Sequence, residues 1–279
     1  MRNKRSAYHP IGPSFRDPAG FVFTHEGKIF RAIHVSGQQD YDQFMGSGLF
    51  ESLVKKGLLV NHEETDTLET DANIYKIIKP AQIEFISYPY EWSFSQLKHA
   101  AMLTLAVQRE AMKFDMTLKD ASAFNVQFCG SKPVFIDTLS FAPLVEGSPW
   151  MSYQQFCRHF LAPLLLMAKT DVSLSKLSSI FIDGVTLPLA SKLLPKRSWL
   201  DIGVFLHIHL HARMQRAYSQ AQERGERKAL GKNALAGLID SLESAVSKIK
   251  FMLPNTEWRD YYDNTNYTDL NPSEASNSC

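Results

Sequence analysis

The sequence has few cysteines and no long apolar run. Its three cysteines, Cys129, Cys157 and Cys279, are odd in number and form no C-x-x-C pair, which argues against a disulfide framework and a structural zinc site. No stretch approaches the ~20 apolar residues of a membrane helix, so we expect no membrane span. The basic N-terminus is not followed by the apolar segment of a secretory signal. These absences predict a cytoplasmic protein.

The chain also lacks an excess of charge of either sign. Its 30 basic and 29 acidic residues leave a formal net charge of +1. Nucleic-acid-binding proteins usually carry a clear basic excess, so we expect no nucleic-acid partner. What is present is a globular composition: 279 residues, of which 44% are hydrophobic and 11% aromatic. That is enough for one large domain, or for two lobes that share a cleft.

Residues 15–90 are predicted to be rich in β-structure. Short aromatic and β-branched runs at 21–23 and 29–33 flank a turn at 25–27 and predict a hairpin. An apolar pattern over 40–56, ended by Gly57, predicts a helix, although Gly46 and Gly48 weaken its middle. Further strands are expected at 58–60, 74–78 and 83–87, and residues 62–64 are expected in a solvated turn. The predicted order is β-β-α-β-β-β.

Residues 91–267 are predicted to be mainly helical. A helix is expected over 93–113, with Ser93 or Ser95 as its N-cap. Apolar runs at 126–128 and 134–136, joined by a turn at 130–133, predict a hairpin within this part. Helical patterns dominate from 152 to about 253. The polar residues 268–279 are predicted to be a disordered tail.

Three polar residues near the hairpin have a spacing that suits phosphate chemistry. Asp120 and Asn125 are separated by four residues in a loop that leaves a helix, and Asp137 is expected at the end of the second strand of the hairpin. A tight hairpin folds back on itself and can bring Asp137 to the cleft of Asn125. Phosphoryl transfer needs a carboxylate to orient the attacking hydroxyl and hard oxygen ligands to hold Mg²⁺. The same residue types also serve as turn and cap residues, which is the alternative interpretation.

The stretch LKDASAFNV and the following FID resemble the catalytic loop and metal-binding strand of the protein-kinase-like superfamily, especially its aminoglycoside- and choline-kinase-like branches. There the pattern is D-x-x-x-x-N, a hairpin, and a strand that ends in I-D. The resemblance implies an α+β, two-lobed fold with a β-rich N-lobe at 15–90 and a helical C-lobe at 91–267. It also implies ATP and Mg²⁺ as cofactors, Asp120 as catalytic base, and Asn125 and Asp137 as metal ligands.

A second resemblance covers most of residues 15–267. The runs SYPYEWSFSQLKHAA, LKDASAFN and FIDTLSF are similar to a bacterial domain found upstream of SAM-dependent methyltransferase domains. This resemblance implies a functional link to methylation and a methyltransferase as a possible partner. The chain itself shows no glycine-rich SAM-binding motif.

The sequence departs from the kinase pattern where a nucleotide would be held. Leu118 stands where a His is usual, Thr138 to Ser140 replace Phe-Gly, and no G-x-G-x-x-G is present. The nucleotide-binding basic residue is expected to be Arg31 or Lys28, with Glu51 as its ion-pair partner. Arginine is a planar donor fork and does not simply replace lysine. Glu91, near the expected hinge between the lobes, could reach a ligand in the cleft.

Three functions follow from these features. The leading hypothesis is an ATP- and Mg²⁺-dependent phosphotransferase acting on a small-molecule or glycan hydroxyl, with acceptor specificity set after residue 152. The alternative is a catalytically inactive, nucleotide-sensing or scaffold partner of a methyltransferase. The third is an enzyme unrelated to phosphate that uses a metal bound by His207, His209 and His211. A helix would place His207 and His211 on one face and His209 away from it, so hydrogen-bonding roles are favoured for them.

Overall fold

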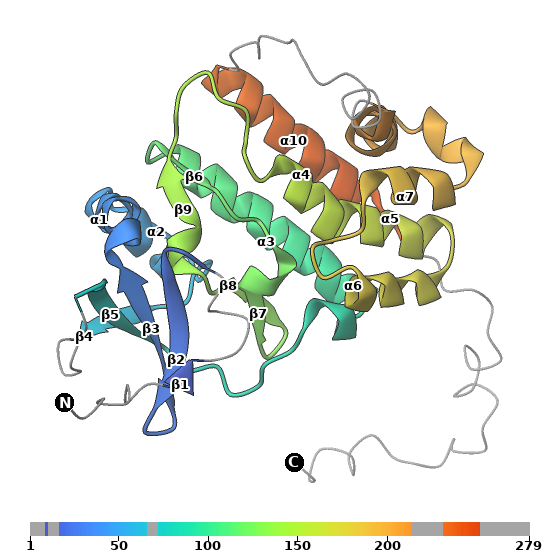
Figure 1. The fold of residues 1–279 in the computed structure, drawn as a ribbon. Coiled ribbons are helices and arrows are strands. Elements are labelled where there is room, and N and C mark those ends of the chain that lie inside the picture. Colours follow the sequence, from blue (N-terminus) through green and yellow to red (C-terminus); the bar gives the residue numbers. More distant parts are fainter. Residues whose placement is uncertain (1–8, 11–16, 66–71, 214–230, 252–279) are drawn as a thin grey trace, which may run out of the picture. The chain divides into compact units, whose positions relative to one another are not determined.

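The computed structural model describes residues 9–10, 17–65, 72–213 and 231–251 (Figure 1). The predicted tail at 268–279 lies outside the described residues. The chain up to Ile249 forms one compact unit, and it combines a small antiparallel sheet with a larger helical part, as predicted. Within the described ranges, no helix has both the length and the apolar character needed to cross a membrane.

A five-stranded antiparallel sheet forms from the first 80 residues. Its order is β1-β2-β3-β5-β4. The strands are β1 (His9–Pro10), β2 (Gly20–His25), β3 (Lys28–His34), β4 (His62–Thr65) and β5 (Ile74–Pro80). The predicted hairpin is that of β2 and β3, which turns at Glu26 and Gly27 with φ of 49° and 73°.

Two helices replace the single helix predicted at 40–56. They are α1 (Gln38–Gly46) and α2 (Leu49–Lys55). The break falls at Gly48, whose φ of 84° lies in the left-handed region that glycine adopts without a Cβ penalty. Buried Tyr41 and Phe44 of α1 and Leu53 of α2 contribute to the core.

Three predictions for the β-rich segment were wrong. Residues 62–65 form the edge strand β4 instead of a turn, because their backbone pairs with β5 although their side chains are polar. Residues 58–60 form only an isolated parallel bridge between Leu59 and Phe135. Residues 83–87 are not a strand. The sheet ends at Pro80, which has no N–H to continue the ladder.

The long helix α3 (Phe94–Met112) confirms the prediction for 93–113. The Ser93 hydroxyl accepts a hydrogen bond from Gln96 N, and the Gln96 side chain accepts one from Ser93 N. This reciprocal capping satisfies two amides at the start of the helix. Leu97, Ala101 and Leu105 are buried on the face that α3 turns to the core.

The segment after α3 contains the predicted hairpin followed by helices, and also a short ladder that was not predicted. β6 (Met116–Leu118) pairs with β9 (Phe141–Pro143), and β7 (Val126–Cys129) forms a hairpin with β8 (Lys132–Phe135). The helices are α4 (Tyr153–Phe156), α5 (Ala162–Lys169), α6 (Leu177–Ile180), α7 (Leu187–Leu193), α8 (Ile202–Val204) and α10 (Lys232–Lys248). Two π-helical turns, Cys157–Leu161 and Phe205–Leu210, interrupt this part.

A strap of backbone hydrogen bonds joins the segment after α2 to the β7–β8 hairpin. Val60 N donates to Phe135 O at 2.9 Å, and Phe135 N donates to Leu58 O at 2.9 Å. These bonds hold β8, and with it Asp137, against the chain that leads into β4.

Candidate functional site

A cavity of about 640 Å³ lies between the sheet and the loops around the β7–β8 hairpin. Its apolar lining includes Val22, Ile29, Val60, Ile78, Ile83 and Ile136. Its polar lining includes Asp17, Arg31, Asp120, Asn125 and Asp137. The three residues of the D-x-x-x-x-N and I-D patterns therefore line one cavity together with Arg31, while their chemical roles stay predictions.

Asp137 is held by the turn that follows it. It lies two residues beyond the end of β8, not at the strand end as predicted, and caps the 3₁₀ turn Thr138–Ser140. Its Oδ1 accepts from Leu139 N at 3.0 Å, and its Oδ2 accepts from the Ser140 hydroxyl at 2.6 Å. The sequence Asp-x-x-Ser thus fixes the carboxylate through a local cap.

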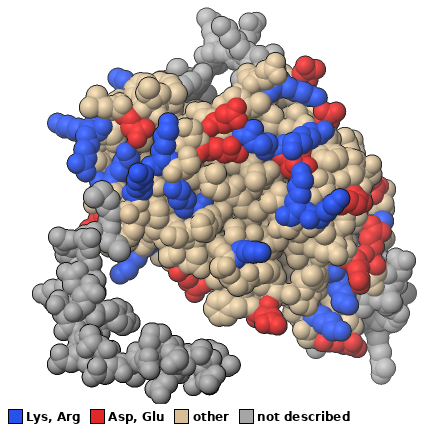
Figure 2. Space-filling model, turned by 180° about the vertical axis from the view of Figure 1, so that it is seen from behind, with Lys and Arg blue, Asp and Glu red and all other residues tan. Residues whose placement is uncertain are grey.

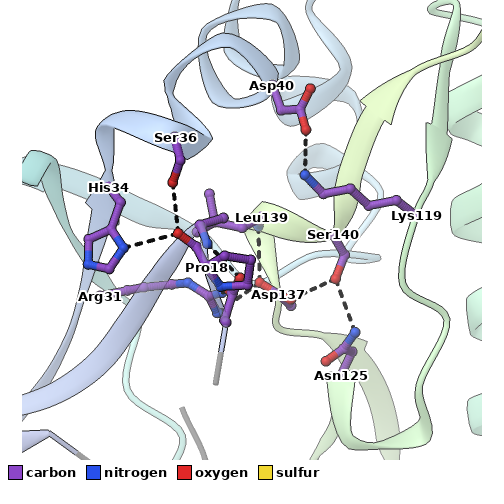
Figure 3. A network of polar contacts seen from close by, with 12 residues as sticks. Pro18, Arg31, His34, Ser36, Asp40, Lys119, Asn125, Asp137, Leu139 and Ser140 are labelled. Carbon is purple, nitrogen blue, oxygen red and sulfur yellow. Dashed lines mark hydrogen bonds and ion pairs between the residues drawn. The ribbon is translucent and has the colours of Figure 1, made fainter. Parts of the chain in front are cut away.

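Asn125 is joined to Asp137 through Ser140 (Figure 3). The Asn125 amide nitrogen donates to Ser140 Oγ at 3.0 Å, and that hydroxyl donates to Asp137. Ser140 is only 1% exposed. Sequence reasoning did not assign Ser140 a role at this site, although its position three residues after Asp137 is the spacing of such a cap.

Asp120 lies in the loop after β6 and is partly buried. Its Oδ1 accepts from Ser122 N at 2.8 Å. Burial raises the pKa of Asp120 above its usual range, and the nearby charges of Asp137 and Asp17 act in the same direction. Hydrogen bonds from Ser122 N and from the Gln155 side chain only partly offset this. A carboxylate with a raised pKa is a stronger proton acceptor when ionised.

Side chains from residues 150–155 hold the Asp120 loop on both sides. The Gln155 side-chain oxygen accepts from Ala121 N at 2.8 Å. On the other side of Asp120, Trp150 Nε1 and Ser152 Oγ donate to Leu118 O at 2.9 and 3.0 Å. Leu118, which stands where the kinase pattern has His, contributes its carbonyl to this support.

Arg31, from β3, reaches across the cavity to the hairpin. Its Nη1 lies 2.8 Å from Asp137 Oδ1, and its Nη2 lies 2.6 Å from Asp17 Oδ2. The side chains of Arg31 and Asp137 are each 14% exposed. Within the described part of the chain, Arg31 Nε is buried without a hydrogen-bond partner. Of the two basic residues predicted for this place, Arg31 is the one that lines the cavity.

Asp17 was not predicted to belong to the site. It precedes β2, and its Oδ1 accepts from Ala19 N at 2.9 Å. The adjacent Pro18 carbonyl accepts from Ser36 Oγ at 2.7 Å and lies 3.1 Å from His34 Nδ1. Figure 3 shows Pro18, with its contacts to Ser36 and His34, beside Arg31. No spacing rule in the sequence relates Asp17 to the D-x-x-x-x-N loop.

The other predicted binding residues lie elsewhere. Lys28 lines a separate cavity of about 310 Å³, together with His62, Glu63 and Lys79. Glu51 is exposed in the first turn of α2, so the predicted Glu51 ion pair is replaced by the pairs of Arg31 with Asp17 and Asp137.

Glu91 is exposed in the turn Pro89–Glu91, which follows the segment that leaves the sheet. Its carboxylate accepts from Tyr88 N at 2.7 Å and so caps its own turn. It is not among the residues that line the 640 Å³ cavity.

The donor set at the hairpin suits a hard divalent cation. Because the Asn125 nitrogen is bonded to Ser140, the Asn125 amide oxygen is left for another partner. Asp137 Oδ2 accepts one hydrogen bond and keeps a second acceptor direction. Among the residues that the structure describes, no cluster of three His, Cys, Asp or Glu side chains forms a ready-made metal cage. Mg²⁺ commonly completes such a sparse set with water and phosphate oxygens.

His207 and His209 have hydroxyl partners on both ring nitrogens. His207 lies 2.7 Å from Tyr153 Oη and 2.9 Å from Ser241 Oγ. His209 lies 2.8 Å from Ser191 Oγ and 2.9 Å from Ser198 Oγ. His211 packs against the Tyr153 ring at 4.8 Å. These contacts give the histidines hydrogen-bonding and packing roles in the helical part.

Comparison with known proteins gives one clear sequence relative. The nodulation protein NoeA of Rhizobium meliloti (strain 1021) is 34% identical over 266 residues, which cover 92% of this chain and 56% of NoeA. The chain thus spans about half the length of this curated relative. No family model matches the chain. The structure of vaccinia related kinase 3 matches 88% of this chain and 87% of its own, with a TM-score of 0.42 and 10% identity. That likeness is too remote to assign a fold.

Proposed function

We propose that this chain has a protein-kinase-like arrangement and is an ATP- and Mg²⁺-dependent phosphotransferase acting on a small-molecule or glycan hydroxyl. The observation that supports the proposal is the meeting of Asp120, Asn125, Asp137 and Arg31 at one cavity. The order of elements agrees with it: an antiparallel sheet with α1 and α2 inserted, then α3, the Asp120 loop and the hairpin. The division into lobes near residue 90 is part of this proposal.

Each polar residue has a distinct role in the proposed reaction. Asp120 accepts a hydrogen bond from the acceptor hydroxyl, orients it and takes its proton. Asn125 and Asp137 supply oxygen ligands for Mg²⁺, and Arg31 neutralises phosphate charge. When bound, ATP would supply its γ-phosphoryl group to the acceptor oxygen and leave as ADP. The apolar side chains of β2, β3 and β5 provide a surface for the base, and the helical part after residue 152 provides acceptor specificity.

The test is a phosphotransfer assay on the purified chain. Mg-ATP is incubated with a panel of sugars, aminoglycosides and amino alcohols, and product formation is followed by mass spectrometry. Turnover should disappear in Asp137→Ala and persist in the matched control Asp42→Asn, because Asp42 is an exposed carboxylate on α1 that does not line the cavity. Undiminished turnover in Asp137→Ala would reject the assignment.

A second candidate is a catalytically inactive, nucleotide-sensing or scaffold partner of a methyltransferase. The observation that favours it is that the Arg31 guanidinium already pairs with Asp17 and Asp137. This pairing neutralises Asp137, the proposed metal ligand. Thermal shifts with ATP alone and with ATP plus Mg²⁺ separate the two functions. A catalyst should be stabilised most by ATP with Mg²⁺, by mass action, and should turn over. A sensor should bind nucleotide without turnover, and a scaffold should show no shift.

A further inference from the structure

Exposed apolar side chains are concentrated in one short segment of the helical part. Among the described residues, five of the fifteen large apolar side chains that are exposed fall within residues 193–206. They are Leu193 at 38%, Trp199 at 39%, Leu200 at 87%, Ile202 at 76% and Leu206 at 40% exposed. Leu200 and Ile202 protrude most, where the 3₁₀ turn Lys196–Leu200 passes into α8. Such clustering differs from the scattered apolar residues of an ordinary surface.

Basic side chains surround this apolar segment. Lys192, Lys196 and Arg197 are exposed, and no ion pair joins them to another residue of the described chain. The single acid within residues 192–206, Asp201, pairs with Lys169 at 3.0 Å, so its charge is balanced locally. Figure 2, the view from behind, shows several Lys and Arg side chains grouped at its upper left.

The segment is held in place by His209, one of the three alternating histidines in the sequence. The Trp199 ring stacks on His209 with centroids 4.2 Å apart and an interplanar angle of 12°. His209 is itself fixed by hydrogen bonds with Ser191 and Ser198. The guanidinium carbon of Arg213 lies over the Trp199 ring, 5.8 Å from its centroid. The protruding residues therefore stand on a preorganised base, which lowers the entropy lost when they contact a partner.

We propose that residues 192–206, together with Arg213, form a docking surface for an anionic lipid membrane, which we term the basic apolar tip. Protruding Leu200 and Ile202 suit insertion among lipid chains, Trp199 suits the interface, and the lysines and arginines suit anionic headgroups. An apolar peptide would instead need a groove, and neither of the two cavities described above is lined by the tip. The proposal is independent of phosphotransfer at the Asp120 site.

Vesicle cosedimentation of the full chain tests the proposal. Binding is measured to phosphatidylcholine vesicles and to vesicles that also contain phosphatidylglycerol, at low and high salt. We expect binding to the anionic vesicles only, weakened by salt. Leu200→Ser with Ile202→Ser should weaken it by about tenfold or more, since each loses the transfer free energy of a buried apolar side chain. Lys196→Gln with Arg197→Gln should weaken it and reduce its salt dependence.

The matched control is Ile180→Ser with Ile182→Ser. These residues are 71% and 62% exposed at the end of α6, outside the basic apolar tip, so binding should be unchanged. Circular dichroism and thermal unfolding of each variant check that the fold is kept. The proposal is overturned if the native chain stays in the supernatant when the anionic vesicles are pelleted, which is also the outcome expected of a surface for an acidic protein. It is equally overturned if the Leu200 and Ile202 variant binds as well as the control.

Discussion

Asp120 is an acid whose surroundings oppose its charge. Because its folded-state pKa is raised, its contribution to stability is present below the unfolded-state pKa and is lost as pH rises through the folded-state pKa. At neutral pH the ionised group therefore costs stability, as expected of a residue kept for chemistry. An Asn at this position keeps an oxygen for Ser122 N and carries no charge.

We expect Asp120→Asn to lower phosphotransfer by roughly 10²–10⁴-fold while raising the melting temperature at neutral pH. The stability gain should shrink as pH falls through the Asp120 pKa, because the native residue is then also uncharged. Differential scanning calorimetry across a pH series measures the gain, and the assay above measures activity. A variant that is less stable at neutral pH would contradict this account of Asp120.

Gln155 is a positioning residue for Asp120. In Gln155→Leu the hydrogen bond that lowers the Asp120 pKa is lost, so the acidic limb of the kcat/KM profile should move to higher pH. Its neighbour Gln154 is exposed on α4, and Gln154→Leu should leave the profile in place. A Gln155→Leu enzyme with reduced kcat but an unmoved profile would indicate only a structural role.

The sequence predicted which residues near the β7–β8 hairpin would line one cavity, but it did not predict the residues from other parts of the chain that contact them. Asp120, Asn125 and Asp137 belong to one short segment whose hairpin geometry is local. Asp17 and Gln155 reach the site only through tertiary packing, so no spacing along the chain reveals them. Glu51 was wrongly paired with the cavity arginine because the break at Gly48 was not resolved from the sequence.

At the scale of elements, the pairing of β2 with β3 places Arg31. Gly20 of β2 pairs with Ile33 of β3, and a Cβ there would fall 2.1 Å from Ala32 O and 3.1 Å from Leu139 Cδ1. Both neighbours adjoin the site, since Ala32 follows Arg31 and Leu139 N binds Asp137. The absence of a side chain at Gly20 thus permits the approach of β3 to the 3₁₀ turn Thr138–Ser140.

Gly20→Ala should destabilise the protein by about 1–3 kcal/mol, because backbone atoms must move to accept the methyl group. The matched substitution is Gly46→Ala, where a Cβ would meet nothing within 4 Å at the end of α1. It should be neutral or stabilise the protein by about 0.4–1 kcal/mol. Urea unfolding of both variants measures the difference, and equal effects would show that the β2–β3 approach is not tight.

Elements with a clear apolar period or a capping residue could be predicted from the sequence. The edge strand β4 and the end of the sheet at Pro80 could not. The Ser93 cap and the apolar repeat predicted α3, and the turn residues Glu26 and Gly27 predicted the first hairpin. The polar strand β4 has no alternating pattern, because as an edge strand it needs only backbone pairing with β5. Residues 83–87 include β-branched and aromatic side chains (Ile83, Phe85 and Ile86), but Pro80 ends the sheet before them.

At the scale of the whole molecule, buried histidines make the fold sensitive to acid. Burial lowers the pKa of His62, His159 and His207 from 6.5 to about 4. Their contribution to stability is therefore present above pH 6.5 and is lost as pH falls towards 4, since the unfolded chain binds the protons first. The three lie in different parts of the fold, on β4, on the first π-helical turn and on the second.

The free energy of unfolding should fall as pH drops from about 6.5 towards 4, because His62, His159 and His207 take up protons on unfolding. His209 and His211, whose pKa values burial also lowers, add to this uptake. Denaturant titrations at closely spaced pH values give the proton number from the slope. His62→Gln should reduce that number by one, because Gln does not titrate in this range. A free energy that is independent of pH over this interval would refute the assignment.

The strap between Val60 and Phe135 determines how the cavity can change in size. Its backbone hydrogen bonds anchor β8 to the chain beside the sheet, whereas within the described chain no backbone hydrogen bond holds residues 83–86, two of which line the cavity. Amide protons of Val60 and Phe135 should thus exchange with solvent slowly, and those of residues 83–86 quickly. Bulky ligands would be admitted by bending of the 83–86 segment, and the walls nearest Asp137 would keep their spacing.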